Sequence, residues 1–89
     1  MPTAQLILTV KNRDGIIYSG EVLSITSYND RGKFDILSRH ANFISLINKE
    51  IIIRFLNNEE KKMEIDNGVI RVIDNKIDIY LGIGKSPSV

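Results

Sequence analysis

The stretch KMEIDNGVIRVIDNKIDIYL, residues 62–81, decides the fold class of the chain. Met63 and Ile65 alternate with charged residues, and the end of the stretch repeats this alternation of apolar and polar side chains. A period of two is typical of β-strands that bury one face and expose the other. Asn67-Gly68 and Asp74-Asn75 interrupt the alternation. We expect a tight turn at each pair, because Asn, Asp and Gly adopt positive φ at low cost.

The same pattern extends through the rest of the chain, which is rich in isoleucine and poor in alanine. Leu6–Val10 alternates in the same way, while Phe43–Ile47 and Ile51–Leu56 are apolar enough to be central strands. Asn12–Gly15 and Asn29–Gly32 have the composition of turns. No segment has the apolar stripe of a helix. The sequence therefore predicts an all-β fold, a two-layer antiparallel β-sandwich of roughly 8–10 short strands.

Length and composition predict a single domain without strong attraction to nucleic acid. We expect the sandwich to span residues 1–81 of the 89, with a flexible C-terminal tail over residues 82–89. The net charge is +1 with interspersed signs, whereas a nucleic-acid interface needs a basic stripe. The longest wholly apolar run, Ile51–Ile53, is far too short to cross a membrane. The chain has no cysteine, which excludes disulfides and fits a reducing cytoplasm.

Catalytic chemistry has little support in the sequence. A serine–histidine–acid set can be assembled on paper from Ser38, His40 and Asp35, but no oxyanion-hole motif accompanies them. Gly82–Ser86 superficially resembles a phosphate-binding loop, but it lacks the longer glycine spacing and a helix to follow it. The single histidine and scattered carboxylates have no metal-ligand spacing. We therefore expect a non-catalytic protein without a cofactor or a metal.

A known family shares the order of these motifs. The stretch GKFDILSRHANFI, residues 32–44, resembles the signature of the epsilon subunit of rotary ATP synthases, in which a strand leads into a Gly-His-Ala-Pro turn and an apolar strand. Tyr18–Val22 is similar to the family's aromatic-x-Gly-Glu-Val segment, and Asn67–Ile77 is similar to its closing segment. The resemblance covers nearly the whole chain. Arg39 replaces the family's glycine before the histidine, and Asn42 replaces its proline.

The resemblance implies a rotor part. In the family this β-sandwich lies at the foot of the central stalk, packs on the gamma subunit and the c-ring, and helps to couple ion-driven rotation to ATP synthesis. The implied location is the cytoplasmic face of the cell membrane, reached only through the complex, and we expect the isolated domain to be a monomer. The inhibitory two-helix segment that usually follows is absent from this sequence, so the resemblance implies coupling without inhibition by those helices.

Contact residues carry over where positions match. The resemblance implies a c-ring contact at Asn29, Asp30, Arg31 and Lys33, and a gamma-subunit contact at His40, Phe43 and Ser45. Arg31 and Lys33 make the turn basic, although many family members have an acidic residue at the position of Lys33. The residues alone favour a different interpretation, in which the turn is a solvated hairpin tip, His40 caps a backbone group and Phe43 is a core residue.

A stalk foot needs an exposed apolar patch for its partner. We expect this patch at Ile52, Leu56, Val69 and Ile73, beside Phe43. An alternative function is a free-standing β-sandwich module that binds a peptide or a carbohydrate. Such a module needs a groove lined with aromatic side chains, and the chain has no tryptophan and only three tyrosines. A small hydrolase that uses His40 is the third hypothesis.

Overall fold

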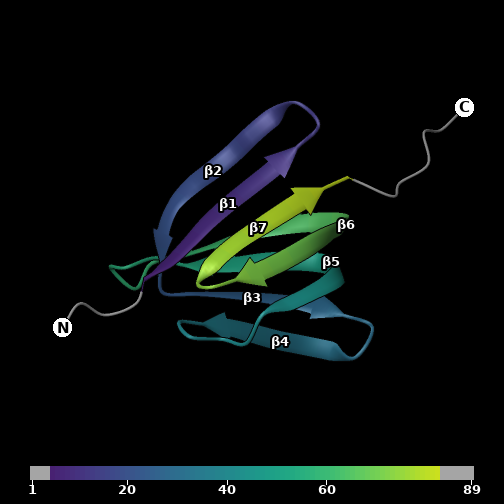
Figure 1. Cartoon of the computed structure of the whole chain (residues 1–89). Helices are drawn as coiled ribbons and strands as arrows, with labels where there is room; N and C mark the ends of the chain where they lie inside the picture. The colour runs from purple at the N-terminus through teal and green to yellow at the C-terminus, as the bar shows by residue number, and fades with distance from the viewer. Residues whose placement is uncertain (1–4, 83–89) are drawn as a thin grey trace, which may run out of the picture.

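The computed structural model describes residues 5–82, which form strands and turns. The strands, shown in Figure 1, are β1 (Leu6–Asn12), β2 (Gly15–Val22), β3 (Ser24–Asn29), β4 (Gly32–Leu37), β5 (Phe43–Arg54), β6 (Glu60–Ile73) and β7 (Lys76–Leu81). The prediction of an all-β fold is confirmed. Residues 5–82 contain no helix long and apolar enough to cross a membrane. Apart from Gly82, the predicted C-terminal tail lies outside the described residues.

The strands form one seven-stranded sheet in the order β2-β1-β7-β6-β5-β3-β4. This sheet folds over on itself at β5 and β6, the two longest strands. Residues 43–47 of β5 pair with β6 alone, whereas its later residues pair with both β6 and β3. One layer of the sandwich therefore holds β2, β1, β7 and the adjoining halves of β6 and β5, and the other holds β4, β3 and the remaining halves (Figure 1).

Two details differ from the sequence prediction. The sheet is mixed, because β1 and β7 run parallel while the other neighbours are antiparallel. Residues 5–82 form seven strands and not 8–10. The count falls because two stretches that we expected to be broken are continuous: β5 includes both apolar runs of its region, and β6 includes the predicted turn at Asn67-Gly68.

The bend of β5 and β6 explains why Asn67-Gly68 is not a hairpin. Their register shifts between Asn48 and Lys49, and Lys49 has a φ of 72°. Such a bulge increases the local twist and bends the strand. Gly68 lies beside the bulge, where an added Cβ would come within 2.7 Å of the carbonyl oxygen of Tyr80. The glycine is therefore required by the close approach of β7 and not by a turn.

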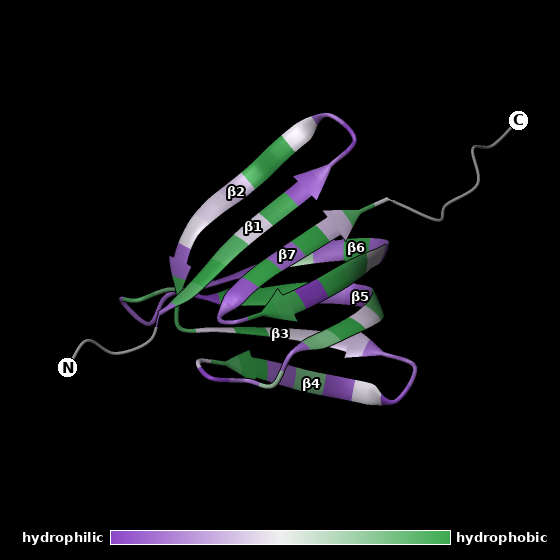
Figure 2. Ribbon diagram, in the orientation of Figure 1, coloured by the Kyte–Doolittle hydropathy of each residue, from purple (hydrophilic) through white to green (hydrophobic). Residues whose placement is uncertain are grey.

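The inner faces of the two layers form a single apolar core. Along β7, for example, apolar residues alternate with polar ones, as the green and purple bands in Figure 2 show. The fully or nearly fully buried side chains are Leu6, Leu8, Val10, Val22, Ile25, Ile36, Ile47, Ile51, Ile53, Ile70, Val72, Ile77 and Ile79. Burial of each one stabilises the fold by about 1.5–3 kcal/mol before the entropy cost of ordering.

Three of the predicted turns are confirmed. The side chain of Asn12 accepts a hydrogen bond from the backbone N–H of Asp14 at 2.8 Å, and Gly15 follows with a φ of 130°. Between β6 and β7, Asp74 and Asn75 have φ values of 49° and 67°. The turn over residues 29–32 has the same construction as the first one. Asn and Asp accept these backbone conformations because their short polar side chains bond locally.

Candidate interaction surfaces

The most exposed large apolar side chains lie on the first half of β5. Leu46 is 75% exposed and Ile44 is 67% exposed. On the same outer face, Leu46 lies opposite Val69 of β6, and Ile73 further along β6 is 41% exposed. We call Ile44, Leu46, Val69 and Ile73 the outer strip. Arg71 lies opposite Ile44 and separates Val69 from Ile73 on this face, so the strip is a group of apolar side chains around one arginine. Exposed apolar side chains grouped in this way are typical of a protein–protein contact, because a monomer seldom leaves them in water.

The outer strip differs from the predicted patch. Leu56 is 56% exposed and Val69 and Ile73 belong to the strip, as expected. Ile52 is half-buried on the outer face of the other layer, between Thr26 and Lys62, so it belongs to a different surface. The prediction missed Ile44 and Leu46. Their apolar character is visible in the sequence, because the first half of β5 is apolar on both faces. The sequence does not say which of the two faces points inward.

The backbone beside the outer strip is also open. Residues 43–47 of β5 pair with β6 on one side, and no strand within residues 5–82 pairs with them on the other. An edge of this kind presents backbone N–H and C=O groups that can pair with another chain. The outer strip therefore borders a free sheet edge, which adds hydrogen-bonding capacity to an apolar contact.

Phe43, which precedes Ile44 of the outer strip, contacts His40 through its ring. Phe43 is half-buried and packs against the core, with its ring centroid 5.4 Å from that of Phe34 and 5.6 Å from that of His40. His40 Nδ1 lies 2.7 Å from the carbonyl oxygen of Ala41, and the ring is half-buried. These contacts fit the interpretation of Phe43 as a core residue and of His40 as a cap on a backbone group.

The loop before β5 is held by the turn between β6 and β7. Arg39 has a φ of 68°, a conformation that glycine adopts most easily, which accounts for the glycine at this position in the resembling family. The backbone N–H of Arg39 donates to Asn75 Oδ1 at 2.7 Å, and the N–H of Asp74 donates to Asn42 Oδ1 at 3.1 Å. Two side-chain amides thus fix the position of the loop that carries His40.

The residues expected to face the c-ring form the turn between β3 and β4, which we call the tip. Asp30, Arg31 and Lys33 are exposed there, and their formal charges sum to +1. Asn29 is half-buried, and its side chain reaches the other predicted site: Asn29 Nδ2 donates to Ser45 Oγ at 3.2 Å. A hollow of about 280 Å³ adjoins this contact, lined by Asp30, Ser45, Leu46 and Asn48. The structure therefore places the tip beside the outer strip.

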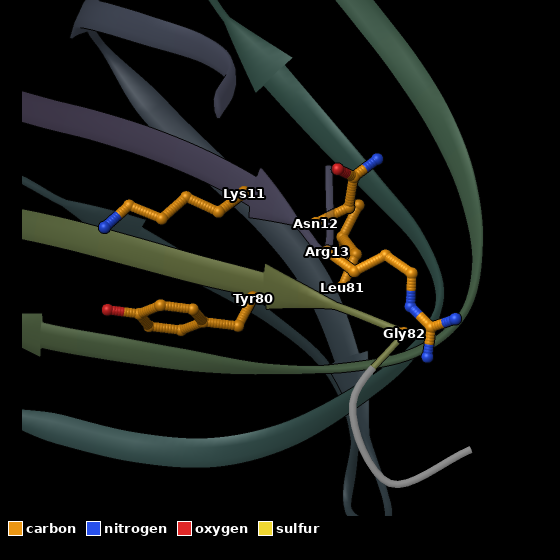
Figure 3. Close-up of a pocket in the computed structure, with 6 residues that line it drawn as sticks. All are labelled: Lys11, Asn12, Arg13, Tyr80, Leu81 and Gly82. Carbon is orange, nitrogen blue, oxygen red and sulfur yellow. The ribbon is translucent and has the colours of Figure 1, made fainter. Parts of the chain in front are cut away.

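The other hollows have little capacity for a ligand. Figure 3 shows one of about 190 Å³ lined by Lys11, Asn12, Arg13, Tyr80, Leu81 and Gly82. Lys11 Nζ lies 5.3 Å from the centre of the Tyr80 ring, so one of its two cations already contacts an aromatic face. Small-molecule sites usually enclose about 300–1,000 Å³. A hollow of this size at the end of the sandwich is too small to enclose a cofactor.

The polar face of the second layer likewise offers no catalytic set. A hollow of about 300 Å³ on this face is lined by Thr26, Asp35, Arg54 and Glu60, among others. Thr26 donates a hydrogen bond to Asp35, and Arg54 forms an ion pair with Glu60. Asp35 therefore bonds Thr26, while the Nδ1 atom of His40 contacts a backbone carbonyl; a catalytic triad needs that nitrogen on the acid. Within residues 5–82, no group of three or more His, Cys, Asp or Glu could hold a metal ion.

The comparisons of this chain with known proteins all indicate the same family. Residues 5–81 match the family described as ATP synthase, Delta/Epsilon chain, beta-sandwich domain. The ATP synthase epsilon chain of Sulfurimonas denitrificans is 32% identical over 81 residues, covering 88% of this chain and 61% of that protein. The epsilon chain of Helicobacter pylori strain 26695 is 30% identical over 76 residues, covering 85% and 62%. The chain thus spans about three fifths of the length of these relatives.

Solved structures support the same fold. A chain from the structure of the Euglena gracilis mitochondrial ATP synthase, OSCP/F1/c-ring in rotational state 1, matches 91% of this chain with a TM-score of 0.82 at 24% identity, over 52% of its own length. A chain from the central stalk/c-ring of the Tetrahymena thermophila mitochondrial ATP synthase matches with a TM-score of 0.73 at 16% identity, covering 91% and 66%. The chain belongs to the beta-sandwich family of ATP synthase delta and epsilon chains.

Proposed function

We propose that the chain is a non-catalytic rotor subunit of a rotary ATP synthase, which packs on the gamma subunit and the c-ring and so couples ion-driven rotation to ATP synthesis. Membership of the family supports this proposal, as do relatives that carry the name ATP synthase epsilon chain. The observation on which it rests most directly is the outer strip with its free sheet edge, because a stalk subunit must bury apolar surface against its neighbours.

We assign the gamma contact to the outer strip and the c-ring contact to the tip. Among the residues proposed for gamma, Phe43 packs against the core and His40 caps a backbone group, so both support the contact from beneath. Ser45 lies at the border of the strip, beside Leu46. The c-ring contact comprises Asn29, Asp30, Arg31 and Lys33. Their basic excess favours an acidic counterpart and raises the association rate more than the final affinity.

The proposed location follows from the proposed partners. The c-ring lies in the membrane, and this chain would join the complex peripherally, on the cytoplasmic face. We expect the isolated chain to be a monomer at low concentration. The alternative, a free-standing module for a peptide or carbohydrate, has less support, because the hollows described above lack a groove lined with aromatic side chains.

A matched pair of isoleucines tests the gamma contact. Ile44 on the outer strip is 67% exposed, and Ile16 on β2 is 64% exposed at the opposite edge of the same layer. Ile44→Asp and Ile16→Asp thus introduce the same charge at similar exposure. We expect Ile44→Asp to weaken binding to the purified gamma subunit tenfold or more, as burial of a charge at an interface does, and Ile16→Asp to leave it unchanged.

The measurement is biolayer interferometry with the host's gamma subunit, with circular dichroism to verify that both variants fold. Equal affinities for the two variants would place the gamma contact elsewhere. A wild-type chain that binds neither gamma nor the c-ring, and does not co-purify with the host's synthase, would contradict the proposed function as a whole.

A further inference from the structure

The two proposed contact surfaces meet where the backbone pairing of β3 and β5 stops. The two strands pair from Ser24 and Arg54 as far as Tyr28 and Asn48. The residues before Asn48, 43–47 of β5, lie in the other layer and pair only with β6. On the partner strand, β3 continues past Tyr28 by one residue to Asn29. Past this point no ladder hydrogen bond connects the tip to the first half of β5. The next connection is made by a side chain.

That connection runs through Asn29 in both directions. Its Oδ1 accepts a hydrogen bond from the backbone N–H of Arg31 at 2.9 Å, which fixes the turn of the tip. Its Nδ2 donates to Ser45 Oγ at 3.2 Å, and Ser45 Oγ in turn lies 3.0 Å from the carbonyl oxygen of Leu46. One amide therefore uses its acceptor on the tip and its donor on the strand that carries the outer strip.

We propose that Asn29 is a positioning residue that holds the tip in a fixed orientation relative to the outer strip, so that two partner contacts form on one rigid surface. Its contact with Ser45 is part-buried, where water competes less for the hydrogen bond. The hollow bordered by Asp30, Ser45 and Leu46 lies at this junction, where the two partners would approach each other. This inference rests on the proposed function for the identity of the partners, but not for the connection itself.

The decisive variant is Ser45→Ala. It removes the acceptor for Asn29 Nδ2 while the turn keeps its own hydrogen bond to Asn29 Oδ1. Ser45 is on β5 and not on the tip, so a serine that contacted only gamma would leave c-ring binding unchanged. We expect Ser45→Ala to weaken binding of the full chain to detergent-purified c-ring by roughly two- to tenfold, the range expected for loss of one hydrogen bond.

Further variants separate positioning from general damage. Asn29→Ala should weaken c-ring binding at least as much, and the double variant should be no weaker than Asn29→Ala alone, because both changes break one connection. Ser19→Ala removes an exposed hydroxyl on β2 and is the matched control, expected to bind as the wild type does.

A second measurement needs no partner. Hydrogen exchange of the Arg31 amide in the isolated chain should be faster in Ser45→Ala than in wild type, because the turn loses its anchor, while core amides should exchange as before. Unchanged exchange at Arg31, or c-ring affinity equal to that of Ser19→Ala, would overturn the inference. If the wild-type chain binds no c-ring, the c-ring part of the proposed function is wrong, and the exchange result alone still decides whether Asn29 positions the tip.

Discussion

Gly68 allows a close approach of β6 to β7, and its replacement by alanine should destabilise the fold. A Cβ at this buried position would lie 2.7 Å from the carbonyl oxygen of Tyr80, and ordinary contact begins near 3.4 Å. The oxygen belongs to the backbone of a strand that is paired on both sides, so it cannot rotate away. The two strands would have to separate by about 0.7 Å, and side-chain atoms of Leu81 at 3.1 Å add to the crowding.

We expect Gly68→Ala to lower the free energy of unfolding by about 1–3 kcal/mol, the usual cost of overpacking a close-packed site. For a domain of this size each kcal/mol corresponds to a fall in Tm of about 4–8 °C. The assay is urea denaturation followed by circular dichroism, in which the midpoint should fall while the slope stays constant.

Gly20→Ala is the matched control. The three atoms nearest to its Cβ would all belong to Tyr18, the closest being the hydroxyl oxygen at 2.8 Å, which is the far end of a flexible side chain that can move aside. We expect a change in unfolding free energy of less than about 1 kcal/mol. Equal stabilities for Gly68→Ala and the wild type, or equal losses for the two alanine variants, would refute the steric explanation for Gly68.

Three further changes test other contacts. Ser27→Ala removes a fully buried hydroxyl that donates to the carbonyl of Glu50 at 2.8 Å, and it should cost about 1 kcal/mol of unfolding free energy in chemical denaturation. Asn75→Ala removes the acceptor for the Arg39 N–H and places alanine, which lacks the short polar side chain of asparagine, at a φ of 67°; we expect a loss of about 1–3 kcal/mol, measured by thermal unfolding. Glu60→Gln breaks an exposed ion pair and should change the Tm by no more than about 4 °C at either low or high salt.

The short-range signals in the sequence predicted the local structure well. Asn12–Gly15 and Asp74-Asn75 are turns because their residues alone favour positive φ or local side-chain bonds. Asn67-Gly68 has an equally strong turn signal, yet it lies inside β6. What differs is the neighbour: β7 packs so closely there that only glycine fits, and a contact between distant segments cannot be read from a pair of adjacent residues.

The site was less predictable than the fold, for a related reason. In residues 43–47 apolar side chains occur on both faces, so alternation identifies a strand without saying which face is inward. The structure turns Phe43 toward the core and leaves Ile44 and Leu46 in water. The bulge at Lys49 sets this orientation, and a lysine in the sequence gives no indication that a bulge will form there. Likewise, nothing in the sequence of β1 or β7 indicates that they run parallel.

That parallel pair has a consequence for synthesis of the chain. Within residues 5–82, β7 is the only strand that pairs β1 and β2 with the rest of the sheet. Until residue 81 has emerged from the ribosome, β1 and β2 are an isolated hairpin, and two strands alone are marginally stable in water. Stable pairing of β1 and β2 with the sheet therefore waits for β7. We expect stalled nascent chains that lack β7 to remain sensitive to protease, and chains that expose it to become resistant in a single step.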